Sequence, residues 1–284
     1  MTTLRAPTAK PVTLTAIHPS PAVKSWYRSR LDSLIAEMTN STLYWIRATW
    51  RKDPPVIAQD GFAPGYVPPV MAEDASPIVE MRRTMRLLAR RWQSKFDAAA
   101  DEIARMFADK SKRATDAAMM ATLREAGFAL TFKPSAALNN GMKAIVHENV
   151  ALIRSIPAEY LRKVEQDVWQ SIRKGYDLGT LTAKLQTDYR VATFNRAALI
   201  ARDQTAKAKG VIEAKRRQQL GITEAIWQHS GGGKEPRPDH VEAGRKQLRF
   251  KLDKGAYISG EYIFPGELIN CRCTSRGVIP GIDN

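Results

Sequence analysis

The feature that most constrains the fold is a long apolar stripe in the first half of the sequence. From Ile78 to Met106, apolar residues recur at gaps of three and four without interruption. This spacing places them on one face of a single long helix. Such a face is buried only against other long helices, as in a helical bundle or a coiled-coil seam. The stripe therefore predicts a largely helical protein.

Other helices are predicted from their start and stop signals. Ser20-Pro21 and Ser76-Pro77 each combine an N-cap residue with proline at the first helical position. The first helix should run from Pro21 to about Trp50, and the second should end near Met106. Further helices are predicted at about 111–127, 135–154, 157–174, 178–188 and 193–220.

Strand patterns are short and concentrate after Gly221. They cover about 223–229, 256–258 and 262–264, and one more alternating segment lies at Phe128–Lys133. We therefore expect a mostly α fold with a small α+β unit at the C-terminus. Residues 1–20 carry no helical period and are predicted to be a flexible or partner-ordered tail. A Pro- and Gly-rich linker at 52–75 interrupts a helical N-terminal region at 21–133, and a second domain covers 134–284.

The net charge favours a polyanionic partner. The chain has 44 Lys and Arg against 29 Asp and Glu, which gives +15. Such an excess favours nucleic acid or an acidic protein surface. Non-specific contact with double-stranded DNA is one interpretation, and an ordinary solvated helix face is the other. The residues concerned are Arg82, Arg83, Arg86, Arg90, Arg91, Lys207, Lys209, Lys215, Arg216 and Arg217. The sequence contains no apolar run of membrane-spanning length, so no membrane partner is expected.

Three tryptophans in the first helical region have two interpretations. Trp26, Trp45 and Trp50 can be core residues, or they can form a docking surface for a larger partner, because aromatic anchors are enriched in interfaces.

Both cysteines lie one residue apart near the C-terminus. In an extended chain Cys271 and Cys273 point to the same face, and so short a disulfide ring is strained. With Asp239 and His240 they form a set of residue types that zinc accepts. Paired zinc cysteines usually have two to four residues between them, so two reduced thiols in a small core, with the histidine capping a turn, remain an alternative. Reduced thiols fit synthesis in a reducing cytoplasm.

Four ordered motifs resemble the phage minor head proteins of the Mu F-like, head morphogenesis family. They are Ala198–Gln204, Ile226–Ser230, Pro236–His240 and Pro265–Cys273, and the resemblance covers about 149–280. It implies a minor capsid component of the virion that associates with the portal in the capsid interior and assists head assembly. Partners then include portal, scaffold or major capsid protein, and some relatives contact packaged DNA or accompany it on ejection.

Four motif residues are expected to have structural roles. Arg202 and Asp203 can form an ion pair that ties their helix to the C-terminal segment, and Trp227 and Asn270 belong to the same set. We expect no catalysis, because acid and base partners are scarce around the motifs. The alternatives are a small Cys/His or zinc-dependent hydrolase or nuclease, and a DNA-binding protein without sequence preference.

Overall fold

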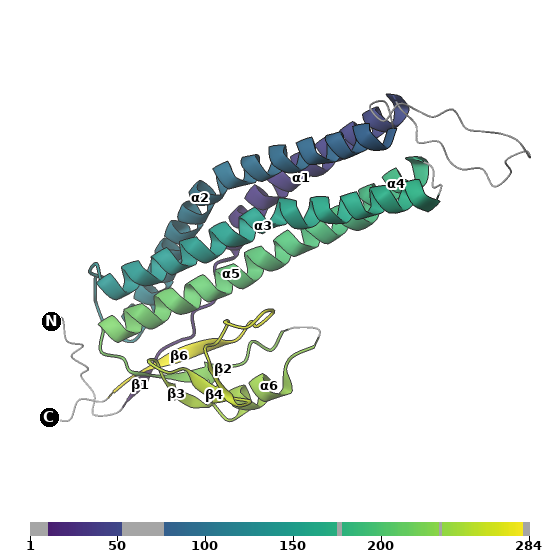
Figure 1. Ribbon diagram of the computed structural model, residues 1–284. Helices are drawn as coiled ribbons and strands as arrows, with labels where there is room; N and C mark the ends of the chain where they lie inside the picture. The colour runs from purple at the N-terminus through teal and green to yellow at the C-terminus, as the bar shows by residue number, and fades with distance from the viewer. Residues whose placement is uncertain (1–10, 53–76, 175–177, 233–234, 281–284) are drawn as a thin grey trace, which may run out of the picture. The chain divides into compact units, whose positions relative to one another are not determined.

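The computed structural model describes residues 11–52, 77–174, 178–232 and 235–280. Figure 1 shows long helices and a small set of short strands near the C-terminus. The helices are α1 (Pro21–Lys52), α2 (Pro77–Glu125), α3 (Ala136–Lys174), α4 (Leu178–Lys184), a π-helical turn (Leu185–Tyr189), α5 (Arg190–Gln219) and α6 (Pro238–Arg245). The strands are β1 (Val12–Thr13), β2 (Glu224–Gln228), β3 (Arg249–Lys251), β4 (Ala256–Ile258), β5 (Glu261–Ile263) and β6 (Thr274–Ile279). The predicted fold class, mostly α with a small C-terminal α+β unit, is confirmed.

Two helices are longer than the sequence signals predicted. The stop expected after Met106 does not occur, and α2 continues to Glu125. The ion pair Arg113–Asp109, at 2.9 Å and one turn apart, lies within the continuing helix. The two helices predicted at 135–154 and 157–174 form one continuous helix, α3, with Pro157 inside it. Proline lacks the N–H donor of a helical hydrogen bond, but buried apolar residues on both sides of it, such as Ile156 and Leu161, hold the helix together.

The strand predicted at 128–133 does not form. Instead, Gly127 adopts a φ of 87° and closes α2 with a Schellman motif, in which Phe128 N donates to Leu123 O at 2.8 Å. The alternation of apolar residues has another cause: Phe128 is buried against the C-terminal core, and Phe132 lies 4.5 Å from the Arg216 guanidinium.

Contacts divide the chain into two units, which do not follow the sequential boundary predicted near 133. Unit 1 comprises Met1–Arg28, Glu102–Asn149 and Leu199–Asn284, whereas unit 2 comprises Ser29–Asp101 and Val150–Ala198. Helices α1, α2, α3 and α5 contribute residues to both units. The predicted linker at 52–75 lies outside the described residues except for Lys52, the last residue of α1.

Unit 2 is helical. Its core contains much of the predicted stripe, with Met81, Met85, Leu88, Trp92 and Phe96 all buried. Helices α1 and α2 lie side by side there (Figure 1), and the Thr49 and Thr84 hydroxyl oxygens are 2.9 Å apart.

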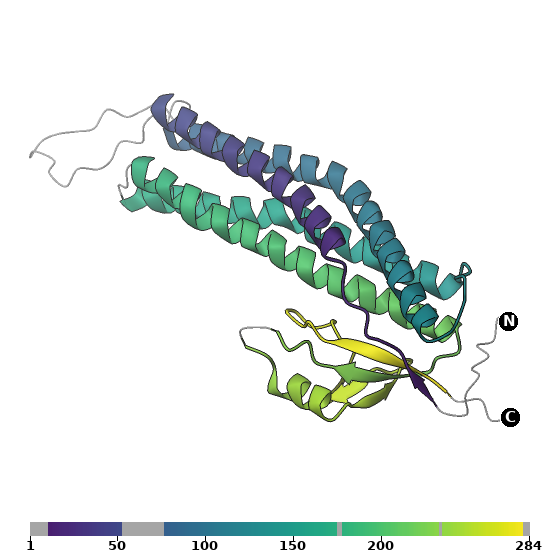
Figure 2. The ribbon, with the colours of Figure 1, turned by 180° about the vertical axis from the view of Figure 1, so that it is seen from behind.

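Unit 1 contains the antiparallel four-stranded sheet, in the order β1-β6-β2-β3, and the two-stranded β4–β5 hairpin. Strand β1 pairs with β6 at the sheet edge, and the chain then leads into α1 (Figure 2). Leu14 and Ile17 after β1 are buried in the core. The prediction of a flexible tail at 1–20 is therefore wrong for residues 11–20, because β6 offers an unpaired edge and the core accepts two apolar side chains. Residues 1–10 lie outside the described part.

Candidate functional site

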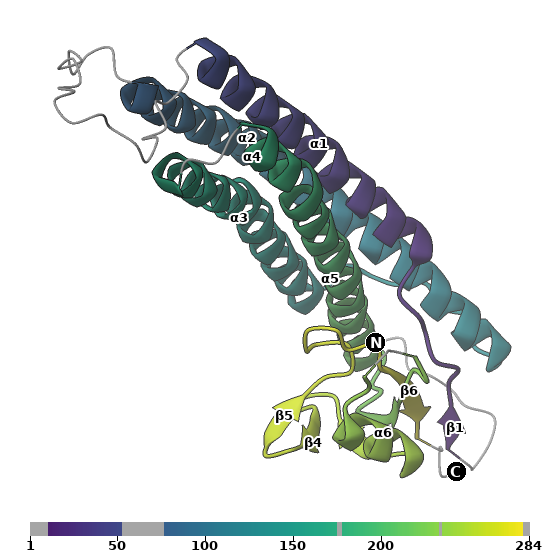
Figure 3. The same cartoon turned by 90° about the vertical axis from the view of Figure 1, so that its right-hand side faces the viewer.

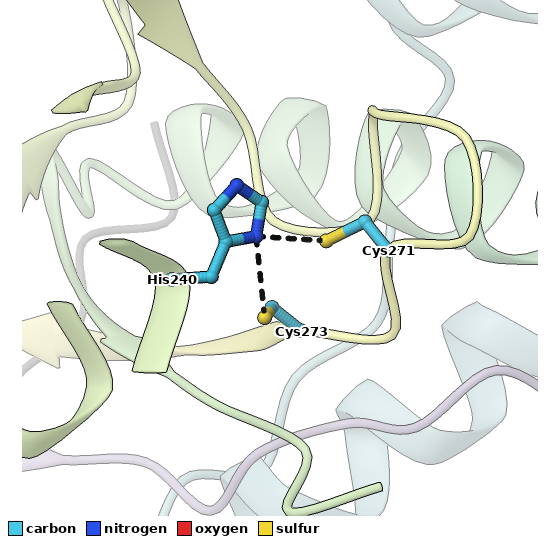
Figure 4. A group of neighbouring side chains, drawn as sticks. All are labelled: His240, Cys271 and Cys273. Carbon is cyan, nitrogen blue, oxygen red and sulfur yellow. Dashed lines mark hydrogen bonds between the residues drawn. The ribbon is translucent and has the colours of Figure 1, made fainter. Parts of the chain in front are cut away.

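Three side chains from two separate segments of unit 1 converge in a buried position. His240 lies on α6, while Cys271 and Cys273 lie in the segment that leads into β6 (Figure 4). His240 Nδ1 is 3.5 Å from Cys271 Sγ and 3.8 Å from Cys273 Sγ. The three potential ligand atoms all lie within 4.8 Å of one another. Nitrogen and sulfur donors in this arrangement are suited to a soft or borderline metal ion.

Helix α6 positions the histidine. Pro238 opens the helix, which lies beside strand β4 (Figure 3), and His240 on its first turn points into the core. The Trp227 and His240 rings make an edge-to-face contact, with ring centroids 5.1 Å apart. Trp227 is itself buried and packs against Phe250, so the core fixes the orientation of the histidine ring.

Asp239, the fourth member of the predicted metal set, is occupied elsewhere. Its Oδ2 accepts a 2.6 Å hydrogen bond from the Ser259 hydroxyl, and its Oδ1 accepts one from His240 N at 2.9 Å. The Ser259 hydrogen bond holds the pKa of the Asp239 carboxyl below its usual range. Within the described residues, Asp239 is not grouped with the three converging side chains.

The cysteines are presented by a tight loop. Gly266 has a φ of 87°, and its backbone N–H donates to Cys271 Sγ at 3.4 Å. A hydrogen bond from the Cys273 thiol lowers the pKa of Cys271 to about 5, and the same interaction raises the pKa of Cys273. The pair is therefore arranged to hold one thiolate near neutral pH.

The motif residues Arg202 and Asp203 fasten this loop to α5. Asn270 has a φ of 64°, and its backbone N–H donates to Asp203 Oδ2 at 3.1 Å. The Arg202 guanidinium donates to the side-chain oxygen of Asn270 and also reaches Asp203 Oδ1, at 3.3 Å. These contacts fix the backbone directly before the cysteine pair, and asparagine is among the residues that tolerate a left-handed conformation.

Three of the five basic residues predicted on α5 to contact DNA are buried in internal ion pairs. Lys209 and Arg217 both pair with Glu213, one helical turn away. Arg216 forms a bidentate pair with Asp116 of α2, with both N···O distances at 2.8 Å. Burial lowers the pKa of Arg217, which is 1% exposed, while Glu213 favours its charged form. These three side chains cannot reach a phosphate backbone in this fold.

The other two basic residues on α5 are partly exposed. Lys207 pairs with Glu148 at 2.8 Å, and Lys215 approaches the Gln218 side chain at 3.4 Å.

The five basic residues predicted on α2 are all exposed. Arg82, Arg83, Arg86, Arg90 and Arg91 project from unit 2. Arg83 lies 3.9 Å from Glu80, and Arg82 lies over the Trp169 ring. The predicted contact set therefore separates into an exposed group on α2 and a largely internal group on α5.

The three tryptophans of α1 have different environments. Trp45 is 44% exposed and forms an edge contact with Tyr44, which is 64% exposed. Trp50 is buried, and Trp26 is half-buried beneath the Lys110 ammonium, 5.2 Å from its ring centre. Of the three, Trp45 presents the largest accessible surface.

The sequence did not lead us to predict that Asp116 and Glu213 are the buried acidic partners of the basic residues on α5. The spacing of Lys209, Glu213 and Arg217 at successive helical turns was a usable signal for an internal ion-pair network. No comparable signal existed for Asp116 and Arg216, because their pairing joins two distant helices.

Comparisons with known proteins place the motifs in a family. A protein-family model with the description Phage Mu protein F like protein matches residues 162–276 of this chain. A protein of Haemophilus influenzae (strain KW20 / Rd), described as an uncharacterized protein, is 26% identical over 283 residues, which is 99% of this chain and 57% of that protein. The chain thus spans little more than half the length of this relative. No solved structure gives a significant match.

Among the described helices, none has the length and apolar character needed to cross a membrane. The resemblance to the Mu F-like phage head proteins that the sequence motifs predicted is confirmed by this family-model match over residues 162–276.

Proposed function

We propose that this chain is a minor head protein that associates with the portal during head assembly, lies in the capsid interior and contacts packaged double-stranded DNA through its phosphates. The observation that carries the proposal is that some of the predicted functional residues make internal contacts whereas others are exposed. Within the family-matching segment, Arg202, Asp203, Trp227 and the His240–cysteine group make internal contacts. Of the residues predicted to contact a partner, the exposed ones are Trp45 and the five arginines, and these lie on α1 and α2. Unit 1 would then be the rigid part, and unit 2 would carry the contact surfaces.

The portal contact is assigned to an apolar set at one end of the α1–α2 pair. Tyr44 and Trp45 lie late in α1, and exposed Val79 and Leu87 lie early in α2. The Thr49–Thr84 contact brings these two segments together within unit 2. Exposed aromatic and aliphatic side chains of this kind supply the anchors of protein interfaces.

The portal proposal is tested by co-purification with portal protein at low and high salt. We expect capture that survives high salt, because apolar contacts are not screened by ions. Substituting Tyr44→Ser together with Trp45→Ser should reduce capture by about tenfold or more, which corresponds to the loss of a strong anchor. Substituting Tyr257→Ser and Tyr262→Ser, two exposed aromatics of the β4–β5 hairpin, is the matched control and should leave capture unchanged. Full capture by the Tyr44/Trp45 variant would move the contact away from α1.

DNA contact is assigned to the exposed arginines of α2. From Arg82 to Lys95 the helix contains no acidic residue, so this stretch of α2 itself offers only positive charge to a phosphate backbone. Changing all five arginines, Arg82, Arg83, Arg86, Arg90 and Arg91, to glutamine should weaken binding to a random-sequence duplex by at least about tenfold. The slope of log K against log salt should also become shallower, by about 0.9 for each phosphate that the variant no longer neutralises.

The paired substitution Lys207→Gln with Lys215→Gln on α5 serves as the comparison. We expect a small effect, because Lys207 is already paired with Glu148. If the α2 variant retained both affinity and salt slope while the α5 variant lost them, the DNA surface would lie on α5 instead. If neither variant changed binding, the proposal of a helical DNA surface would fail.

A Cys/His hydrolase receives less support from the geometry. His240 and Cys271 have the residue types of a base and a nucleophile, but both side chains are buried in the core of unit 1. A substrate carbonyl could reach neither atom without opening that core.

A further inference from the structure

We propose that His240, Cys271 and Cys273 bind one zinc ion, which clips the C-terminal loop to helix α6. This inference goes beyond the head-assembly role and does not depend on it. The histidine is 31 and 33 residues away from the two cysteines in sequence, so their convergence is a tertiary feature rather than a consequence of local chain geometry.

The distances fit tetrahedral coordination. With Zn–N near 2.1 Å and Zn–S near 2.3 Å, the nitrogen and sulfur atoms of a tetrahedral site are about 3.6 Å apart. His240 Nδ1 lies 3.5 Å from Cys271 Sγ and 3.8 Å from Cys273 Sγ. A zinc ion can therefore be placed against all three atoms with little movement of the side chains.

The surroundings hold the ligands in place. Trp227 sets the plane of the His240 ring, and Gly266 N points at Cys271 Sγ. The Asp203 carboxylate fixes Asn270, immediately before Cys271. Outer contacts of this type orient the ligands of protein metal sites.

The number of protein ligands determines what occupies the fourth coordination position of the zinc ion. Within the described residues, only these three side chains form a group of metal-ligand types, so the fourth position falls to water. Asp239 lies outside this group, and its two carboxylate oxygens accept hydrogen bonds from the Ser259 hydroxyl and the His240 backbone N–H. The ion would join α6 to the segment before β6 and so stabilise unit 1 by cross-linking it.

The test is metal analysis of the full-length chain purified without chelators. We expect about one zinc per chain, and at least about tenfold less in the variant that combines Cys271→Ser with Cys273→Ser. Two matched controls should keep their zinc: Asp239→Asn, next to the site, and His229→Gln, a neighbouring histidine outside the group. Loss of zinc from Asp239→Asn with retention in the double cysteine variant would overturn the assignment.

A second measurement covers the case in which the cysteine variant does not fold. The wild-type chain is stripped of metal, loaded with Co²⁺ and examined by absorption spectroscopy. We expect the d–d bands of tetrahedral Co²⁺ and sulfur-to-cobalt charge-transfer bands, which zinc should abolish by displacement. A wild-type chain that takes up neither metal would refute the proposal. Because both measurements use the isolated chain, that result would leave the portal and DNA proposals standing.

Discussion

Replacing Arg216 with methionine is expected to lower the free energy of unfolding by about 3–5 kcal/mol, because it leaves the Asp116 carboxylate buried without its main partner. Arg216 donates to both carboxylate oxygens at 2.8 Å, donates to Lys133 O at 2.8 Å, and lies over the Phe132 ring. The side chain thus joins α5, α2 and the segment after α2 within unit 1. Urea denaturation followed by circular dichroism measures the loss.

The matched control removes both charges. The variant Arg216→Met with Asp116→Leu should recover most of the lost stability, since the core then holds neither charge, and Lys112, which also pairs with Asp116 at 3.1 Å, is partly exposed. The same proteins separate this role from DNA binding. If Arg216 bound phosphates, the single variant would show weaker DNA binding and near-normal stability, the opposite of what the buried ion pair predicts.

Replacing Trp227 with alanine should cost about 3–5 kcal/mol of unfolding free energy, the range for removing a large aromatic side chain from a packed core. Trp227 is fully enclosed and makes T-shaped ring contacts with His240 and Phe250. Its removal should therefore destabilise the sheet and loosen the histidine together. Urea denaturation of the purified variant provides the measurement.

Tyr257→Ala is the control for aromatic truncation in the same unit. This side chain is 61% exposed on the β4–β5 hairpin, so the expected change is within about 0.5 kcal/mol. Equal losses for the two variants would show that burial of Trp227 does not decide the stability of unit 1.

The candidate site was only partly predictable from residue types. Cys271 and Cys273 stand one residue apart, and the presence of a histidine upstream suggested a shared ligand. Sequence alone could not choose between Asp239 and His240, because adjacent residues on a helix point in different directions. Only the structure shows that the Asp239 carboxylate accepts a hydrogen bond from Ser259, in the turn between β4 and β5.

The basic residues illustrate the same limit. On α2 the absence of acidic residues between Arg82 and Lys95 predicted an exposed basic face, and those arginines are exposed. On α5 a similar run of charges gave the opposite environment, since Lys209, Arg216 and Arg217 are buried. The difference arises from the buried acidic partners: Asp116 on α2 pairs with Arg216, and Glu213 on α5 itself pairs with Lys209 and Arg217.

The sequence by itself determined the helical class, the apolar face of α2, the C-terminal location of the strands and the family motifs, because these depend on periodicity and residue order over short distances. The tertiary structure decided what depends on distant partners. It placed Val12 and Thr13 beside β6, divided the helices between two units, paired Arg216 with Asp116 and joined His240 to the cysteines. Such contacts are selected by the packing of the whole core, and no local pattern encodes them.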